Sequence, residues 1–184
     1  MNFLKTIELQ YKHLKALSLC KAKSDVRFYL CGIYLGDGFM ASTNGHIALI
    51  IDEENLNGFD LILPSEAVNS LIRKVGNNPK VKTINLHQLD DEYWVLDHQG
   101  SLELFKPIDG KFPDIKHVDI EKPKDIQFKD YPKFNFEYLD IFMKVYKTLG
   151  CKGLSPTIYP TTEEKPAYVE LDSSSHGLLM PMRL

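Results

Sequence analysis

Cysteine is scarce in this sequence and shows no regular spacing. The 184 residues include three cysteines, Cys20, Cys31 and Cys151, which are odd in number and far apart. Such spacing fits neither a disulfide framework nor a zinc site. The six histidines are equally scattered along the chain. We therefore expect reduced thiols, a cytoplasmic protein and no bound metal.

Long apolar runs and a strong excess of charge are also missing. No stretch approaches the roughly 20 apolar residues of a membrane span, and the N-terminus lacks the charged-then-apolar pattern of a signal peptide. The formal net charge is -3, which argues against a protein that coats nucleic acid but allows a local basic face. The length suits one domain or two small ones, with a core that needs no disulfides.

The common catalytic signatures are absent as well. There is no Walker-type glycine loop, because Gly36-Asp37-Gly38 is too short and lies between expected strands. There is no Gly-x-Ser-x-Gly elbow. His46 could act as a catalytic base, but we favour a role in a groove wall or a turn, and we interpret residues 90–92 as a solvated turn rather than a metal site. The absence of these signatures argues against a cofactor and against an enzyme, with an enzyme on an unrelated antiparallel scaffold as the alternative.

What the sequence contains is one structural pattern that occurs three times. Each unit consists of a helix followed by three short antiparallel strands. The helices are predicted over residues 7–20, from Ser65 to Gly76, and from Asn135 to Gly150, with Ser65 and Asn135 as caps and the two glycines as ends. The strands are predicted over residues 27–35, 39–42 and 47–51, then 61–63, 81–86, 93–96 and 102–105, and finally 157–159, 168–171 and 178–180.

A single unit of this kind cannot bury its own apolar face, so neighbouring units must stack. The expected fold class is α+β, with helices on one side of a continuous antiparallel sheet. Residues 119–133 are charged and contain Pro123 and Pro132, which indicates a connector before the third unit.

The predicted helical segments are basic, although the whole chain is mildly acidic. They carry eight basic and four acidic residues, a net charge of +4. Such a face is either simply solvated or directed at the phosphates of nucleic acid, a contact that needs no base reading. The candidate DNA-facing residues are Lys12, Lys15, Lys23, Arg73, Lys74, Lys144 and Lys147.

The last seven residues, 178–184, are unusually apolar for a C-terminus. Arg183 carries their one side-chain charge, and Pro181 must end regular strand pairing because it has no backbone N–H. Met180 and Met182 flank this proline, and methionine suits surfaces that accept variable partners. The tail is therefore either a last strand in the core or a segment that lines a groove.

The tail resembles the C-terminus of the bacterial DNA polymerase III beta subunit, the replicative sliding clamp. It reads Leu178-Leu179-Met180-Pro181-Met182-Arg183-Leu184. Three further segments resemble the middle domain of that clamp in the same order. Residues 25–30 resemble its first strand, and Thr43-Asn44-Gly45-His46 resembles its Thr-Asp-Gly-His turn. Residues 109–114 resemble its closing Asp-Gly-Arg-Phe-Pro-Asp segment. Leu63-Pro64 likewise stands where the clamp has Val-Pro before a helix.

The resemblance implies a DNA-clamp-like fold built from three repeats. Residues 1–118 resemble the complete middle domain, with two repeats, residues 119–133 form a connector, and residues 134–184 resemble the second half of the C-terminal domain. In the family, six repeats form one subunit and two subunits close a ring through parts that are missing here. A homo-oligomer therefore stays an option, since four chains of three repeats would supply the same total of twelve.

The resemblance also implies a hydrophobic groove that binds clamp-binding motifs of DNA polymerases and repair proteins. The family has Arg-Leu where this chain has Ile47-Ala48, so we expect altered peptide binding. The groove residues carried over by position are Leu30, Thr43, Gly45, His46, Ile47, Ala48, Pro113, Val118, Leu178, Met180, Pro181, Met182 and Arg183.

Two functions follow from the resemblance. The first is a sliding-clamp-like binding protein in DNA replication or repair, which uses this groove and contacts the backbone of double-stranded DNA with its basic helical face. The alternative is a non-encircling decoy, regulator or adaptor that competes for clamp-binding partners.

Overall fold

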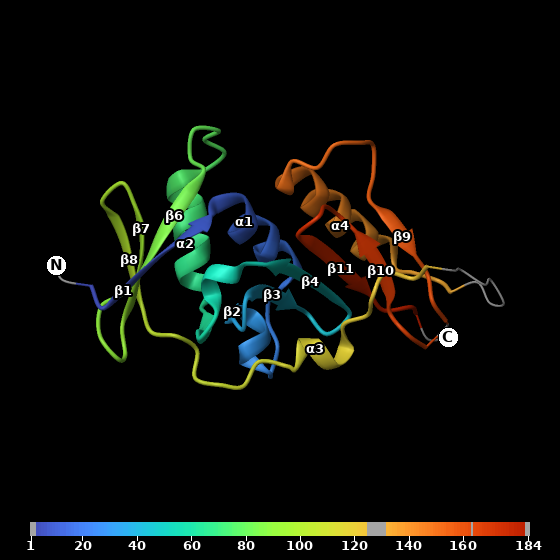
Figure 1. The fold of residues 1–184 in the computed structure, drawn as a ribbon, viewed down its shortest axis with the longest axis horizontal. Helices are drawn as coiled ribbons and strands as arrows, with labels where there is room; N and C mark the ends of the chain where they lie inside the picture. Colours follow the sequence, from blue (N-terminus) through green and yellow to red (C-terminus); the bar gives the residue numbers. More distant parts are fainter. Residues whose placement is uncertain (1–2, 125–131, 163, 183–184) are drawn as a thin grey trace.

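The fold contains three repeats of a helix and antiparallel strands (Figure 1). The structure is a computed structural model that describes residues 3–124, 132–162 and 164–182. The first repeat comprises β1 (Lys5–Gln10), α1 (Tyr11–Cys20), β2 (Ile33–Gly36), β3 (Phe39–Thr43) and β4 (Ile47–Asp52). The second comprises β5 (Asp60–Leu63), α2 (Ser65–Val75), β6 (Thr83–Gln88), β7 (Trp94–His98) and β8 (Ser101–Phe105). After the short α3 (Ile115–Val118), the third comprises α4 (Phe136–Leu149), β9 (Thr157–Tyr159), β10 (Ala167–Glu170) and β11 (Ser175–Leu179).

The strands form two antiparallel sheets rather than the single continuous sheet that the repeat pattern predicted. One sheet has four strands in the order β1-β6-β7-β8, and the other has seven in the order β5-β2-β3-β4-β11-β10-β9. The reason is a strand exchange, because β1 of the first repeat pairs with β6 of the second, and β5 of the second pairs with β2 of the first. The third repeat extends the larger sheet through pairing of β11 with β4, which places Leu178 opposite Ala48.

The helices α1, α2 and α4 lie side by side against the sheets (Figure 1). Leu14 and Leu17 of α1 and Phe142 of α4 are fully buried between helices and strands. Burial of each such side chain stabilises the fold by about 1.5–3 kcal/mol. Phe142 lies directly on Gly177 of β11, where the Cβ of any larger residue would overlap its ring. Within the described residues, no helix is both long and apolar enough to cross a membrane.

Two predicted elements near the N-terminus are wrong. Residues 5–10 form β1, and α1 begins at Tyr11, because buried Ile7 and Leu9 alternate with exposed Glu8 in the period of a strand. Residues 28–31 form a short 3-10 helix, so residues 25–30 are not a strand and β2 begins at Ile33. Asp25 stabilises the bend there, since its carboxylate accepts a hydrogen bond from the backbone N–H of residue 27 at 2.8 Å.

The helix caps agree with the sequence in most but not all details. Asn135 caps α4 as predicted, because its side-chain oxygen accepts a hydrogen bond from the Glu137 N–H at 2.8 Å. Gly150, at φ 77°, ends that helix as predicted. Ser65 is not a cap: it is the first residue of α2, and its hydroxyl donates to the Cys31 carbonyl instead.

The predicted connector, residues 119–133, lies partly outside the described residues, which omit 125–131. Its beginning is fastened to the face of β10 and β11 that points away from α4. Asp119 Oδ1 lies 2.8 Å from His176 Nε2, and Lys122 Nζ lies 2.7 Å from Glu170 Oε1. These contacts hold the end of α3 against the third repeat.

Candidate functional site

A second apolar cluster, on the outer face of the larger sheet, underlies the candidate site. Ala48 and Leu178, which are opposite each other in the β4–β11 register, pack there with Ile115 of α3 and Phe112 before it. A pocket of about 210 Å³ opens beside them, and we name it the junction pocket. Its walls come from the first repeat, from the segment around α3 and from the third repeat. The junction pocket therefore depends on docking of the third repeat.

Ten of the thirteen residues predicted for the groove line the junction pocket. Pro181 is buried and Met182 is half exposed, and neither lines it. Arg183 lies outside the described residues. The ten are Leu30, Thr43, Gly45, His46, Ile47, Ala48, Pro113, Val118, Leu178 and Met180.

The turn between β3 and β4 is held by its own side chains. The Thr43 hydroxyl donates to the Ile47 carbonyl at 2.7 Å and accepts from the Gly45 N–H at 3.0 Å. The Asn44 side-chain oxygen accepts from the backbone N–H groups of His46 and Ile47 at 2.9 and 3.0 Å. Gly45 has φ 88°, a conformation that glycine adopts without strain. The turn thus presents a rigid rim to the pocket.

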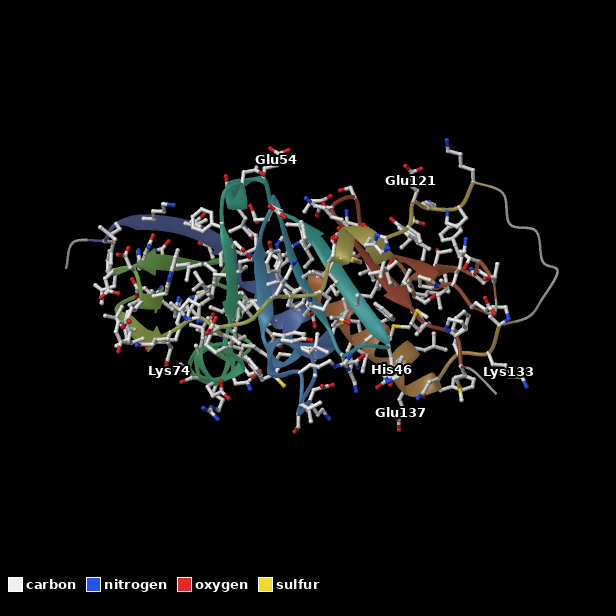
Figure 2. All side chains as sticks on the ribbon, turned by 90° about the horizontal axis from the view of Figure 1, so that it is seen from below. His46, Glu54, Lys74, Glu121, Lys133 and Glu137 are labelled. Carbon is white, nitrogen blue, oxygen red and sulfur yellow. The ribbon has the colours of Figure 1, made fainter. Side chains whose placement is uncertain are left out.

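His46 lies at the rim of the pocket beside the first turn of α4. Its ring stacks on Tyr138 with centroids 5.6 Å apart and an interplanar angle of 16°. Figure 2 shows His46 next to Glu137 at this end of α4. In the part of the chain that the structure describes, no cluster of three or more potential metal ligands is found. This stacked position fits the wall of a binding site.

The C-terminal segment fulfils both roles that its sequence allowed. Leu179 is fully buried in the main core, whereas Leu178 and Met180 line the pocket. The Met180 N–H donates to the His46 carbonyl at 2.9 Å, and the Met182 N–H donates to the Lys133 carbonyl at 2.7 Å. The tail is therefore tied on one side to the β3–β4 turn and on the other to the residues before α4.

Three pocket residues were not predicted from the sequence: Arg27, Ile115 and Pro166. Arg27 is held by two hydrogen bonds to Asp25, from Nε at 3.0 Å and from an NH2 group at 2.9 Å. Because of these side-chain hydrogen bonds, the pKa of Asp25 falls to about 2. Ile115 lies in the sequence between the predicted Pro113 and Val118, and this position is the signal that could have predicted it as a pocket residue.

Ala48 explains the shape of the pocket. It is 6% exposed and lies between Thr43 of β3 and Leu178 of β11 in the sheet register. A leucine at this position would extend into the space that the pocket now occupies. Ile47, by contrast, is 1% exposed and contributes to the main core as well as to the pocket.

The seven candidate DNA-facing residues all lie on or next to the helices, but their charges are not equally available. Lys74 pairs with Glu103, and Lys144 pairs with Asp140 at 2.6 Å. Lys12 Nζ donates to the Leu149 carbonyl at 3.2 Å, and Lys15 Nζ donates to the Asn77 side chain at 2.7 Å. The exposed residues whose charged groups make neither an ion pair nor a hydrogen bond within the described residues are Lys23, Arg73 and Lys147.

The helices are less basic than predicted. Glu8 lies on β1, and Lys21 and Lys23 follow the end of α1. The three helices α1, α2 and α4 contain six basic and three acidic residues, which gives a net charge of +3 instead of +4. The helix layer still differs in sign from the chain as a whole, whose net charge is -3.

Comparison with known proteins identifies the fold. No protein-family model and no curated protein sequence matches the chain. The DNA polymerase sliding clamp from Pseudomonas aeruginosa, solved with a ligand, aligns with 100% of this chain and 67% of its own, with a TM-score of 0.71 and 18% identity. DNA polymerase III subunit beta from Borrelia burgdorferi, in complex with a natural product, aligns with 100% of this chain and 64% of its own, with a TM-score of 0.72 and 13% identity. The sliding clamp from Bartonella birtlesii, bound to griselimycin, aligns with 100% of this chain and 68% of its own, with a TM-score of 0.71 and 16% identity.

The chain thus has the fold of bacterial sliding clamps, which confirms the predicted α+β class with clamp-like repeats. It spans about two thirds of the length of these solved chains, with coverage from 64% to 68%.

Proposed function

We propose that this protein is a sliding-clamp-like binding protein of DNA replication or repair, and that the junction pocket receives clamp-binding peptides. One observation carries the proposal. The β3–β4 turn, the segment around α3 and the C-terminal strand, which are far apart in sequence, converge on one apolar pocket next to a rigid polar turn. A concave apolar site with a few fixed polar groups suits a short peptide with apolar side chains.

The chemistry of the pocket favours a leucine and an aromatic ring of the partner. Burial of two such side chains contributes about 1.5–3 kcal/mol each, while association itself costs several kcal/mol. Ala48 leaves one wall short, so part of the apolar surface of the peptide keeps its contact with water. The gain from two side chains is small against that cost, so we expect modest affinity. No catalytic step is part of this role.

The helix layer supports a second, weaker contact with the DNA backbone. Lys23, Arg73 and Lys147 are exposed and carry no ion pair within the described residues. If these three charges neutralise phosphates, the logarithm of the binding constant falls with the logarithm of salt concentration at a slope of about -2.7. Mobility-shift titrations at several salt concentrations measure this slope, and a strong preference for one DNA sequence would contradict backbone binding.

The same pocket also serves the alternative role, a non-encircling decoy, regulator or adaptor. The observation that favours it is the engagement of the basic side chains, because Lys12, Lys15, Lys74 and Lys144 already make hydrogen bonds or ion pairs within the described residues. Both roles require the pocket, and they differ in whether chains assemble around DNA.

Fluorescence anisotropy with a labelled peptide tests the pocket. The peptide contains a glutamine followed by a leucine and an aromatic residue. Val118 lines the pocket and is 50% exposed, so Val118→Glu places a charge at the rim without disturbing the core. Leu154→Glu, at a residue that is 96% exposed and lines none of the pocket, is the matched control.

We expect Val118→Glu to weaken binding at least tenfold and Leu154→Glu to leave it unchanged. Deletion of residues 180–184 should abolish binding, with circular dichroism as the check that the fold persists. Peptide binding that is unaffected by both Val118→Glu and the deletion would place the site elsewhere.

A further inference from the structure

A second pocket adjoins the junction pocket on the other side of Pro113 and Ile115, which line both. It has a volume of about 360 Å³ and lies on the outer face of the first repeat, and we name it the aromatic pocket. Its aromatic residues are Tyr34 of β2, Phe39 of β3 and Phe112 of the segment before α3. The two pockets are therefore neighbouring depressions that share Pro113 and Ile115 in their lining.

The aromatic residues make a continuous apolar floor. The Tyr34 ring stacks on Phe112 with centroids 5.3 Å apart and lies 5.4 Å from Phe39. Tyr34 is 9% exposed, and its hydroxyl interacts with the nearby carboxylate of Asp60. The floor of the pocket therefore combines aromatic faces with a carboxylate at the Tyr34 hydroxyl.

Negative charge surrounds this floor. Asp37, Asp60 and Asp114 line the pocket, against Lys111 and Lys116, which leaves one net negative charge. Burial, followed by the nearby carboxylates of Asp60 and Asp37, raises the pKa of Tyr34 to about 12. Asp60 and Asp37 therefore lie near the Tyr34 hydroxyl in the lining of the pocket. Phosphate and other anions are disfavoured there, and a cation is favoured.

The chain itself supplies an example of the preferred ligand chemistry. The Lys116 ammonium lies 5.6 Å from the centre of the Phe39 ring and 3.6 Å from Asp37 Oδ2. Both side chains are mostly exposed, at 64% for Lys116 and 60% for Asp37, so this pair is weak and readily displaced. A basic side chain from a partner could take the same aromatic and carboxylate contacts from a deeper position.

We infer that the aromatic pocket receives a lysine or arginine side chain from the segment that flanks the clamp-binding motif of the partner. This inference rests on the proposed function of the junction pocket. An extended chain advances about 3.3 Å per residue, so a residue a few positions from the motif passes over Pro113 and Ile115. The aromatic pocket then adds a preference for basic flanks to the apolar recognition in the junction pocket.

Fluorescence anisotropy with a set of labelled peptides tests the inference. The set contains the motif with neutral flanks, with two arginines three to five residues before it, with two arginines three to five residues after it, and with glutamates at the same positions. We expect one arginine peptide to bind about three- to tenfold more tightly than the neutral peptide. The matching glutamate peptide should bind more weakly than the neutral one.

Three variants assign the preference to the aromatic pocket. Asp37→Asn with Asp60→Asn should abolish the advantage of arginine and leave the affinity for the neutral peptide unchanged. Lys116→Gln removes the competing cation and should enlarge the advantage. Asp140→Asn on α4, which changes charge on the helix side, is the control and should have no effect.

The outcomes separate this inference from the proposed function. If no peptide binds, the proposed function fails, and the inference fails with it. If the neutral peptide binds but neither arginine peptide binds more tightly, the inference alone is overturned. It is also overturned if the arginine advantage survives in the Asp37→Asn and Asp60→Asn double variant.

Discussion

Replacement of Gly177 by alanine is the sharpest test of how the third repeat docks. Gly177 lies in β11 between Val169 of β10 and Leu49 of β4, and the Phe142 ring of α4 lies directly on it. An added Cβ would overlap Phe142 Cε1 and lie 2.6 Å from its Cζ. Real Cβ atoms do not approach other atoms so closely, so the ring or the strand must move.

The size of the effect follows from two opposing contributions. Overpacking in a close-packed core costs about 1–3 kcal/mol, whereas a change from glycine to alanine stabilises by about 0.4–1 kcal/mol through the unfolded chain. The overlap involves a fully buried ring, so the first contribution dominates. We expect a net loss of about 1–2 kcal/mol, equivalent to a drop of about 0.5–1 M in the urea midpoint.

Urea unfolding of three variants measures this effect. Gly110→Ala is the control, because its Cβ would lie 3.4 Å from the nearest atom, an ordinary contact, so its midpoint should equal or slightly exceed that of the parent. Phe142→Leu frees space over residue 177, so the double variant with Gly177→Ala should lose less stability than the sum of the two single variants. An unchanged or raised midpoint in Gly177→Ala would refute the docking of α4 on β11.

Two further predictions concern pH and assembly. His13 of α1 is buried, and burial followed by the Lys12 charge lowers its pKa, while Asp172 acts in the opposite direction. The unfolded chain therefore takes up this proton at a higher pH than the folded chain, so the stability that neutral His13 contributes is present above about pH 6.5 and decreases as pH falls below it. Urea midpoints at pH 7 and 5.5 should fall more in the parent than in His13→Asn, and equal falls would contradict the idea. Light scattering should detect self-association, because β8 and β9 are edge strands without a partner strand in the described residues, and Leu104 of β8 is 59% exposed. Leu104→Lys should lower the mass of the assembly. A parent protein that stays monomeric at high concentration would favour the non-encircling alternative.

Local signals in the sequence predicted much of the fold. The helix from Ser65 to Gly76 and the helix capped by Asn135 are found in α2 and α4, because apolar spacing, a turn residue and a terminal glycine all agree there. β1 was missed because its six residues lead directly into α1 and Gln10 provides no side-chain cap between them. Residues 27–31 contain strong strand formers, but the hydrogen bond from residue 27 to Asp25 bends the chain first.

The candidate site was harder to predict from such local signals. The Thr43–His46 turn and the tail are recognisable as short segments, and the predicted turn residues line the junction pocket together with Leu178 and Met180 of the tail. Pro166 carries no local sign of its position, because it reaches the pocket only through the β10–β11–β4 pairing. The exchange of β1 and β5 between repeats is also a long-range choice, which periodicity within one repeat cannot specify.

The position of the junction pocket couples binding to folding of the third repeat. Ala48 and Val118 form one side of the pocket, and Leu178 and Met180 form the other, so a bound peptide contacts both sides of the β4–β11 pairing. A ligand that binds only the docked form stabilises it by RT ln(1 + [L]/Kd), about 2.7 kcal/mol at a hundredfold excess over Kd. The peptide should therefore restore the urea midpoint of Gly177→Ala toward that of the parent, because the variant loses docking but keeps every residue that lines the pocket.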